Sequence, residues 1–474
     1  VDAIRFAGRP LAEVLQLFAM PGQNGPLFYL VLRPWLAIAG LSEFALRFFS
    51  VVFGTLAVPL VHRLGRRLFP SLPSLALLAV FLTASSPYLV WYGQEGKMYA
   101  LGVALVLFSM DRYLAALEQG GWHRWLLYIV ATSFAFYVHL IAALMVPAQA
   151  AIFFLLDRGA RKARWKPWLV SMAALTLPYL PLLRWQLPML LASGDSGYRF
   201  VPMPDMVLSL LGNYSLGVVQ RPTPWTLALI LGLLLAAGLL WKDHRSRFLG
   251  LGALICWLLI PVLGFFLLTL VRPMYTARYL IFVLPAYLLL LAAGLVAIGR
   301  YSRLIAMLWL AVLVITSGWG TWLQIRTPLK ADFRNATSYV VSHMAPGDLI
   351  LFQIPYGRHS FDYYYRLDER HEQTQPARQP RRGDHWVFLP FVAAAGQGSY
   401  RWADGLYTNG GMSPGEVDRG MTGITAGSPN LWLVATEVEL WDERGLVQAW
   451  LDNHATLTDT AEFVRIKVYR YQLP

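Results

Sequence analysis

The chain has 474 residues, of which 57% are hydrophobic and only 14% are charged, and its mean hydropathy is +0.47. Soluble proteins carry about 25% charged residues, so this composition indicates an integral membrane protein and excludes collagen-like, disordered and nucleic-acid-binding classes. The net charge of +13 comes from residues 1–323, which hold 25 Lys and Arg against 10 Asp and Glu, whereas residues 324–474 hold 15 against 17. Membrane proteins place such a basic excess in their loops, so no nucleic-acid partner is needed to explain it. The single cysteine, Cys256, cannot form an intrachain disulfide.

The first 45 residues precede any apolar run long enough to span a membrane. Residues 26–39 are apolar, but the segment has only 14 residues and contains Arg33 and Pro34. A spanning helix needs about 20 apolar residues, so we expect residues 26–39 to form a helix that lies in or dips from the outer membrane interface.

Longer apolar stretches then recur as far as Trp322. Each covers roughly 18 to 22 residues, which is enough to cross about 30 Å of hydrocarbon. The run from Trp125 to Leu156 has basic residues beyond both ends, which favours two crossings that turn near His139. About ten spans are therefore predicted, near residues 46–62, 73–91, 98–117, 125–138, 140–156, 168–187, 224–241, 249–270, 279–298 and 304–323.

The distribution of basic residues predicts the orientation of these spans, because Lys and Arg are retained on the cytoplasmic side. One alternating set of loops holds fourteen of them and the other set holds five. The poorer set, residues 1–45, 92–97, 188–222 and 272–278, should therefore face outward together with everything after residue 324. With this parity the chain would begin outside the membrane without a signal peptide. We therefore expect that a leading transmembrane helix is missing from this sequence, or that the start is atypical.

Residues 324–474 have a different character, because helix and strand patterns alternate there. Such alternation predicts a small extracytoplasmic α/β domain after the membrane domain of residues 1–323. The predicted helices cover residues 332–344, 359–367 and 443–453, and the predicted strands cover 349–354, 386–390, 431–436 and 464–471. The loop 372–384 and the Gly-rich stretch 396–430 carry no predicted element. The domain has no phosphate-binding motif and no metal-ligand spacing, so no chemistry is predicted for it.

The outer loop 92–97 carries Glu95 and Lys97 between two predicted spans. An ionisable group at the end of a span is costly unless it is paired, solvated or used. A carboxylate and an ammonium two residues apart suit a reaction in which an acid or a metal meets a phosphate. The alternative is a solvated turn that contains an ion pair.

A second outer loop, 272–278, carries Arg272 and Arg278, and Tyr279 follows it. Guanidinium groups bind phosphates in a bidentate manner, so this loop suits a phosphate or diphosphate head group. The alternative is that these side chains only anchor the helix at the interface. His139 is a weaker candidate, since a lone His is usually a structural polar group.

Two other charged pairs have a spacing or a position that indicates a structural role. Glu43 and Arg47 are separated by four residues, as in a structural pair on one helix. Asp111 and Arg112 lie near the predicted cytoplasmic end of their span. We expect neither pair to take part in chemistry.

Four segments taken together resemble glycosyltransferase family 39. They are Gly25-Pro26-Leu27-Phe28-Tyr29-Leu30, residues 40–51 (GLSEFALRFFSV), residues 64–69 (LGRRLF) and the stretch from Ser86-Pro87-Tyr88 to Tyr99. Arg278-Tyr279 before a helix with Pro285, and residues 332–336 (DFRNA), extend the resemblance over most of the chain. This family contains the bacterial relatives of protein O-mannosyltransferases and of the lipid A aminoarabinose transferase. The resemblance implies a polytopic α-helical membrane protein of the GT-C fold, followed by the α/β domain.

The resemblance also implies a hexosyl or pentosyl transferase that takes a sugar from a polyprenyl-phosphate donor on the outer leaflet of a bacterial inner membrane. In such enzymes an acid of the first outer loop, usually in an Asp-Glu pair, acts as the base on the acceptor. That pair is absent here, and Asp2 is the only nearby acid. The family's second loop is matched by residues 93–99, with Lys97 in place of Arg, and its His-Pro-Pro-Leu motif is matched by residues 24–27.

These matches give the expected site. The catalytic candidates are Glu95 and Asp2, and the substrate-binding candidates are Asn24, Gln94, Lys97, Tyr99, His139, Arg272, Arg278 and Tyr279. No cofactor is expected except a divalent metal, for which Glu95 is the candidate ligand.

The missing Asp-Glu pair and the substituted motifs leave an alternative, a non-catalytic GT-C-like subunit of a membrane protein complex. A transporter is a more distant alternative, because the sequence has neither two matching broken helices nor a charge array in the middle of the membrane.

Overall fold

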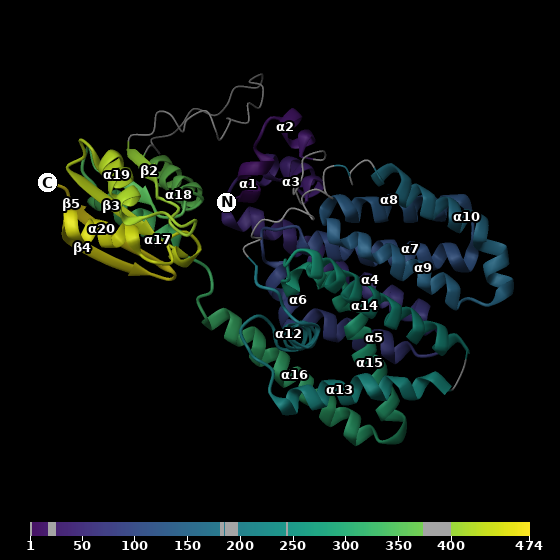
Figure 1. Ribbon diagram of the computed structural model, residues 1–474. Coiled ribbons are helices and arrows are strands. Elements are labelled where there is room, and N and C mark those ends of the chain that lie inside the picture. The colour runs from purple at the N-terminus through teal and green to yellow at the C-terminus, as the bar shows by residue number, and fades with distance from the viewer. Residues whose placement is uncertain (1, 18–24, 181–183, 185–197, 243–244, 373–399) are drawn as a thin grey trace. The chain divides into compact units, whose positions relative to one another are not determined.

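The computed structural model describes the whole chain except residues 1, 18–24, 181–183, 185–197, 243–244 and 373–399. The chain divides into two compact units (Figure 1). The helical unit comprises Pro10–Thr327, and the α/β unit comprises Pro328–Pro474 together with Val1–Arg9. Each unit has its own hydrophobic core.

Most helices of the helical unit coincide with the predicted spans. Five in the described part of the chain are long and apolar enough to cross a membrane: α4 (Glu43–Leu68), α7 (Tyr99–Gln119), Phe248–Val271 within α14 (Arg245–Val271), η4 with α15 (Ala277–Tyr301), and α16 (Arg303–Arg326). A sixth is formed by α5 (Pro73–Ser85) and α6 (Pro87–Gly93) if this pair, bent by 56°, is one span. The helical character with several apolar helices of spanning length is thus confirmed, and the number of ten spans stays a prediction.

The remaining helices are shorter or less apolar. Three are apolar helices of intermediate length: α3 (Pro26–Ala39), η1 (Leu140–Leu144) with α9 (Met145–Leu155), and α13 (Pro224–Ala237) with η3 (Gly238–Lys242). The others are α2 (Leu11–Gln16), α8 (Trp122–Val138), α10 (Arg158–Thr176), η2 (Leu177–Tyr179) and α12 (Met203–Leu216). Sequence analysis missed α12, which lies in the predicted outer loop 188–222, because a helix of 14 residues is too short to register as a span.

Two helices form the centre of the helical unit. In α7 and in η4–α15, 83% and 89% of the most apolar window is buried inside the protein, against 11% in α16. Helix α16 instead exposes large apolar side chains such as Ile315 and Ile325, which suit a lipid environment. Helix α15 also lies very close to α13, since a Cβ atom on Gly294 would be 2.1 Å from the carbonyl oxygen of Leu233. This close approach requires glycine.

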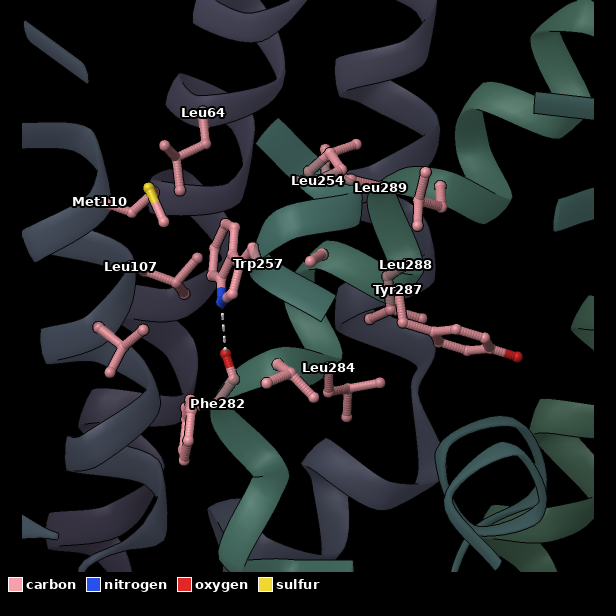
Figure 2. Packing of buried hydrophobic residues seen from close by; sticks show 14 of the residues in the cluster. Leu64, Leu107, Met110, Leu254, Trp257, Phe282, Leu284, Tyr287, Leu288 and Leu289 are labelled. Carbon is pink, nitrogen blue, oxygen red and sulfur yellow. Dashed lines mark hydrogen bonds between the residues drawn. The ribbon is translucent and has the colours of Figure 1, made fainter. Parts of the chain in front are cut away.

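The core around α14 and η4 is drawn in Figure 2. Trp257 of α14 is 1% exposed, and its indole nitrogen donates a hydrogen bond to the carbonyl oxygen of Phe282 in η4 (Ala277–Val283), 3.1 Å away. Leu107, Leu254 and Leu284 belong to the same buried cluster. The tryptophan therefore stabilises the backbone of the short 3₁₀ helix that carries Arg278.

The α/β unit contains a five-stranded sheet with the strand order β2-β1-β3-β5-β4. Strand β1 (Leu349–Phe352) pairs in parallel with β2 (Arg401–Asp404) and with β3 (Asn430–Ala435). Strand β5 (Ile466–Gln472) runs antiparallel to β3 and to β4 (Thr456–Phe463). The unit also includes α1 (Asp2–Ala7) and η5 (Val438–Leu440).

Helices cover both faces of this sheet (Figure 1). On one face, Ile350 and Phe352 pack with α17 (Phe333–His343) and α18 (Gly357–Glu372). On the other face, Leu349 and Leu351 pack with α19 (Pro414–Thr425) and α20 (Leu446–His454). Alternate side chains of β1 therefore belong to two hydrophobic cores, one on each face of the sheet, in a three-layer α/β/α arrangement.

Several predicted elements of this unit are present with shifted ends, and three strands or α-helices described after residue 324 were missed. The predicted helices and strands at 332–344, 349–354, 359–367, 431–436, 443–453 and 464–471 correspond to α17, β1, α18, β3, α20 and β5. The Gly-rich stretch 396–430, for which no element was predicted, contains β2 and α19, and β4 precedes β5. The predicted strand 386–390 lies outside the described residues.

Asp348 connects β1 to β3, and its removal should destabilise the α/β unit. It is 3% exposed and accepts hydrogen bonds from Ala345 N–H (3.0 Å), the Asn430 amide (2.8 Å) and the Trp432 indole (2.9 Å). Asp348→Ala removes the acceptor of all three donors, and the buried Trp432 indole left without an acceptor alone costs about 1–3 kcal/mol. We expect faster hydrogen exchange in β1 and β3 of the full chain. The control Glu462→Gln removes only a surface ion pair with Lys467, so exchange should stay unchanged.

The same contacts predict a pH dependence. Burial alone would raise the pKa of Asp348, but its hydrogen bonds to Ala345, Asn430 and Trp432 and the nearby Arg470 outweigh burial and lower it. The stability contributed by the carboxylate is therefore fully present above the ordinary pKa of about 4 and is lost as the pH falls through the lowered folded pKa. This account would be contradicted if hydrogen exchange in β1 did not become faster at low pH, or if it became faster to the same extent in Asp348→Ala.

Candidate active site

The turn between α6 and α7 is held against α4 through its backbone. The hydroxyl of Ser50 in α4 donates to the carbonyl oxygen of Glu95 (2.6 Å), and the N–H of Lys97 donates to the same oxygen (2.7 Å). A Cβ atom on Gly96 would be 2.6 Å from the side chain of Leu46, so glycine lets the turn approach α4 this closely. These contacts fix the position from which the Glu95 side chain extends.

The Glu95 carboxylate is half-buried among phenol groups. It interacts electrostatically with Tyr92, in the last turn of α6, and with Tyr99, the first residue of α7. Its Oε2 atom is buried and has no hydrogen-bond partner among the described residues. A buried acceptor without a partner costs about 1–3 kcal/mol, so this arrangement favours a function over a purely structural role.

His139 occupies the break between α8 and η1. Its backbone is extended (φ −152°, ψ 109°), which ends α8 and divides the run 125–156 where the sequence predicts a turn. The side chain is 4% exposed, and its ring lies 6.0 Å from that of Tyr99 and 5.6 Å from that of Tyr279. Within the part of the chain that the structure describes, neither ring nitrogen has a hydrogen-bond partner.

Arg278 lies in the first turn of η4, close enough to the same phenol groups to interact with them electrostatically. It interacts electrostatically with Tyr92, Tyr99 and Tyr279, and its guanidinium lies 5.9 Å from the centre of the Tyr279 ring. Its Nε atom is buried and, among the described residues, has no hydrogen-bond partner. It also influences His139 electrostatically.

The backbone around Arg278 is held from two helices. Tyr214 of α12 donates from its hydroxyl to the carbonyl oxygen of Leu280 (2.6 Å), and Trp257 of α14 donates to that of Phe282. Tyr275, three residues before Arg278, donates to the carbonyl oxygen of Met206 in α12 (3.2 Å). Thus α12, which sequence analysis missed, helps to position the arginine.

Glu95, His139 and Arg278 therefore share neighbours, although they lie far apart in the sequence. Tyr99 is common to all three, and Tyr279 lies beside both His139 and Arg278. We call these three residues the polar cluster. Each of them has at least one buried polar atom that lacks a partner in the described protein. Such groups are available to a bound polar ligand, and the cluster combines a carboxylate, an imidazole and a guanidinium.

The other predicted site residues are distributed differently. Tyr99 and Tyr279 lie within the cluster's surroundings, Gln94 is exposed, and Lys97 is half-buried in the Glu95 turn. Arg272 is half-buried just after the last residue of α14, and its role stays a prediction. Asn24 lies outside the described residues. Asp2 is an exposed residue of α1 in the α/β unit, where it interacts electrostatically with His359, and its catalytic role also stays a prediction.

Sequence analysis missed three further tyrosines around the cluster, Tyr88, Tyr92 and Tyr214. Tyr88 and Tyr92 are separated by four residues on α6, and their ring centres are 4.7 Å apart. The ring centre of Tyr92 lies 5.1 Å from that of Tyr99, and the ring centre of Tyr88 lies 5.4 Å from that of Tyr214. The i, i+4 spacing of Tyr88 and Tyr92 was the available signal, but such spacing is also common in helix cores.

The described residues do not supply a metal site around Glu95. They contain no group of three or more His, Cys, Asp or Glu side chains that could hold a metal ion. A divalent cation in a protein usually takes several oxygen ligands, so Glu95 alone does not fit this role.

Comparison with known proteins identifies the fold. The family described as dolichyl-phosphate-mannose-protein mannosyltransferase matches residues 23–185, a stretch that contains Glu95 and His139. The crystal structure of ArnT from Cupriavidus metallidurans bound to undecaprenyl phosphate has a TM-score of 0.55 and 12% sequence identity to this chain, and the match covers 99% of this chain and 93% of ArnT. The apo structure of the same ArnT has a TM-score of 0.55 and 13% sequence identity, and the match covers 99% of this chain and 93% of ArnT. No curated protein sequence matches the chain.

These similarities define the class of the chain as a membrane protein with the fold of the GT-C glycosyltransferases. The resemblance to glycosyltransferase family 39 and its relatives, predicted from short motifs, is confirmed.

Proposed function

We propose that this chain is a membrane glycosyltransferase that moves a sugar from a polyprenyl-phosphate donor to an acceptor at the outer face of a bacterial inner membrane. The observation that carries the proposal is the polar cluster, in which Glu95, His139 and Arg278 keep buried polar atoms free of partners in the described protein. Support also comes from the GT-C fold and from the undecaprenyl phosphate bound to ArnT.

The chemistry assigns one role to each charged group. An acceptor oxygen or nitrogen attacks the anomeric carbon of the sugar, the bond from that carbon to the phosphate oxygen breaks, and the lipid phosphate leaves with the electron pair. Arg278 stabilises the charge that develops on this phosphate through its planar fork of N–H donors, and Lys97 adds a second positive charge. Glu95 orients the acceptor and accepts its proton. His139 forms a hydrogen bond with the polyprenyl-phosphate sugar.

A non-catalytic subunit of a membrane complex is the competing function. It would have no need for three unpartnered buried polar groups in one place, because such groups destabilise a fold that does not use them. The test is release of polyprenyl phosphate from a polyprenyl-phosphate sugar by the purified chain in lipid nanodiscs. Turnover supports the enzyme, and its absence with every hexosyl and pentosyl donor supports the subunit.

The orientation in the membrane gives a separate prediction. Because fourteen basic residues lie on one side and five on the other, the Glu95 turn and the α/β unit should both be extracytoplasmic. In a chain with Cys256→Ser, we expect an impermeant thiol reagent to label Gln94→Cys and Gly423→Cys in intact cells. Gln94 is exposed and Gly423 has open space around it, whereas Gly96 packs against Leu46 and should be avoided.

The exposed residue His123, in a loop predicted to be cytoplasmic, provides the matched control for this labelling. His123→Cys should be labelled only after the cells are opened. Labelling of His123→Cys in intact cells, or protection of either outer site, would contradict the orientation.

A further inference from the structure

A cluster of arginines lies at the carboxyl end of α7, away from the polar cluster at its amino end. Five arginines from four helices contribute: Arg63 and Arg67 of α4, Arg112 of α7, Arg124 of α8 and Arg164 of α10. We call them the arginine cluster. Sequence analysis expected the Asp111-Arg112 pair at its centre to be architectural, but a single buried carboxylate does not need so many basic partners.

Asp111 organises three of these arginines. Its side chain is 1% exposed and accepts hydrogen bonds from Arg63 (3.1 Å), Arg67 (3.2 Å) and the Nε atom of Arg112 (2.9 Å). Arg67 also pairs with Glu118. These contacts hold the guanidinium planes in fixed positions, which reduces the entropy lost when they bind a ligand.

The end of the α7 backbone holds the other two arginines. Arg164 donates from Nε to the carbonyl oxygen of Leu117 (3.2 Å) and from a terminal nitrogen to that of Glu118 (3.4 Å). Arg124 donates to the carbonyl oxygen of Gly120 (3.0 Å). The last carbonyl groups of a helix carry a partial negative charge of about half a unit, which these two arginines complement.

The arginine cluster has more positive charge than its protein partners neutralise. Among the described residues, Asp111 and Glu118 are the carboxylates shown to pair with Arg63, Arg67 and Arg112, whereas Arg124 and Arg164 bind backbone carbonyl oxygens. Five guanidiniums against two carboxylates leave an excess of three positive charges, which the helix dipole offsets only in part. The Arg63 side chain is 55% exposed, so part of this charge is accessible at the protein surface. All five arginines belong to the loops or helix ends that the charge distribution places on the cytoplasmic side.

We propose that the arginine cluster binds the phosphate group of an anionic phospholipid in the cytoplasmic leaflet. Arginine forks match phosphate oxygens in a bidentate manner, and several of them held around one buried carboxylate form a built site. Arg63 contacts the phosphate, and Asp111 acts as a positioning residue that orients the guanidiniums. This site is separate from the proposed donor site and does not depend on the proposed function.

The test measures lipid binding to the purified full chain by native mass spectrometry, with cardiolipin, phosphatidylglycerol and phosphatidylcholine as probes. We expect cardiolipin and phosphatidylglycerol to be retained and phosphatidylcholine to be lost. Arg63→Gln should weaken the binding of the anionic lipids by roughly tenfold or more, as expected for the loss of a charge-assisted contact. Arg66→Gln is the matched control, because it removes the same charge from the exposed surface one turn along α4 and should have little effect.

Asp111→Asn separates a built site from general electrostatic attraction. The substitution makes the surface more positive, so general attraction predicts tighter binding of anionic lipids, whereas loss of the positioning carboxylate predicts weaker binding. If Asp111→Asn does not fold, Glu118→Gln provides the same comparison through Arg67. Equal losses in Arg63→Gln and Arg66→Gln, or tighter binding in either carboxylate variant, would overturn the proposal. Competition by millimolar inorganic phosphate without any retained lipid would assign the site to free phosphate instead.

Discussion

Glu95→Gln is expected to lower the rate of sugar transfer by about 10² or more, because a carboxylate that accepts the acceptor's proton acts mainly in the transition state. The fold should remain stable, since Oε2 of Glu95 is buried without a partner in the described protein and the neutral amide is easier to bury. A turn that contains only a surface ion pair predicts a different result. Such a pair contributes about 0–1 kcal/mol to stability, so its loss would leave both stability and transfer nearly unchanged.

The measurement is turnover of a polyprenyl-phosphate sugar by the full chain in nanodiscs, together with thermal unfolding of each variant. Glu43→Gln is the matched control, because Glu43 pairs with Arg47 at 3.8 Å on α4 as the predicted structural pair. Its turnover should equal that of the wild type. If Glu95→Gln had the turnover of the wild type, the role of the turn would be structural only. If turnover fell only because the variant unfolds, the catalytic assignment of Glu95 would be withdrawn.

Arg278→Lys is expected to weaken donor binding and transfer by roughly 10- to 100-fold, although it preserves the charge. The reason is geometric, because lysine has no Nε–H donor and no planar fork, and the Nε atom of Arg278 has no partner among the described residues. Arg278→Ala should lose more affinity than Arg278→Lys. Donor affinity is measured by titration of nanodiscs with the polyprenyl-phosphate sugar.

The control for this pair of variants is Arg199→Lys, which changes an exposed arginine of another predicted outer loop. We expect its donor affinity to match that of the wild type. Unchanged affinity in Arg278→Ala would show that the arginine only anchors η4 at the interface, and equal losses at Arg199 and Arg278 would indicate general attraction of the donor phosphate.

The helical architecture was predictable from the sequence because apolar length and basic flanks are strong local signals. The ranges of α3, α7 and α16 follow directly from them. Helix α12 gave no such signal, since its 14 residues are too few to register as a span. Likewise β2 has four residues at a sheet edge, and β4 is a mostly exposed edge strand with the polar sequence TLTDTAEF, so neither has a clear hydrophobic pattern.

The candidate site was predictable only residue by residue. Charge at the end of a span drew attention to Glu95 and Arg278, and the break in the run 125–156 drew attention to His139. Their convergence depends on how α7, α8 and η4 pack, and periodicity contains no information about that packing. The same limit explains why Tyr92 was overlooked, since its importance comes from its electrostatic interaction with both Glu95 and Arg278.

A cryo-electron microscopy structure of the full chain with undecaprenyl phosphate would test the central claim most directly, that Glu95, His139 and Arg278 form one site for a lipid phosphate. The account predicts phosphate density within hydrogen-bonding distance of the Arg278 guanidinium, with His139 and Glu95 facing the same ligand. Phosphate density elsewhere, with the buried atoms of these three residues bonded to one another or to water alone, would contradict it.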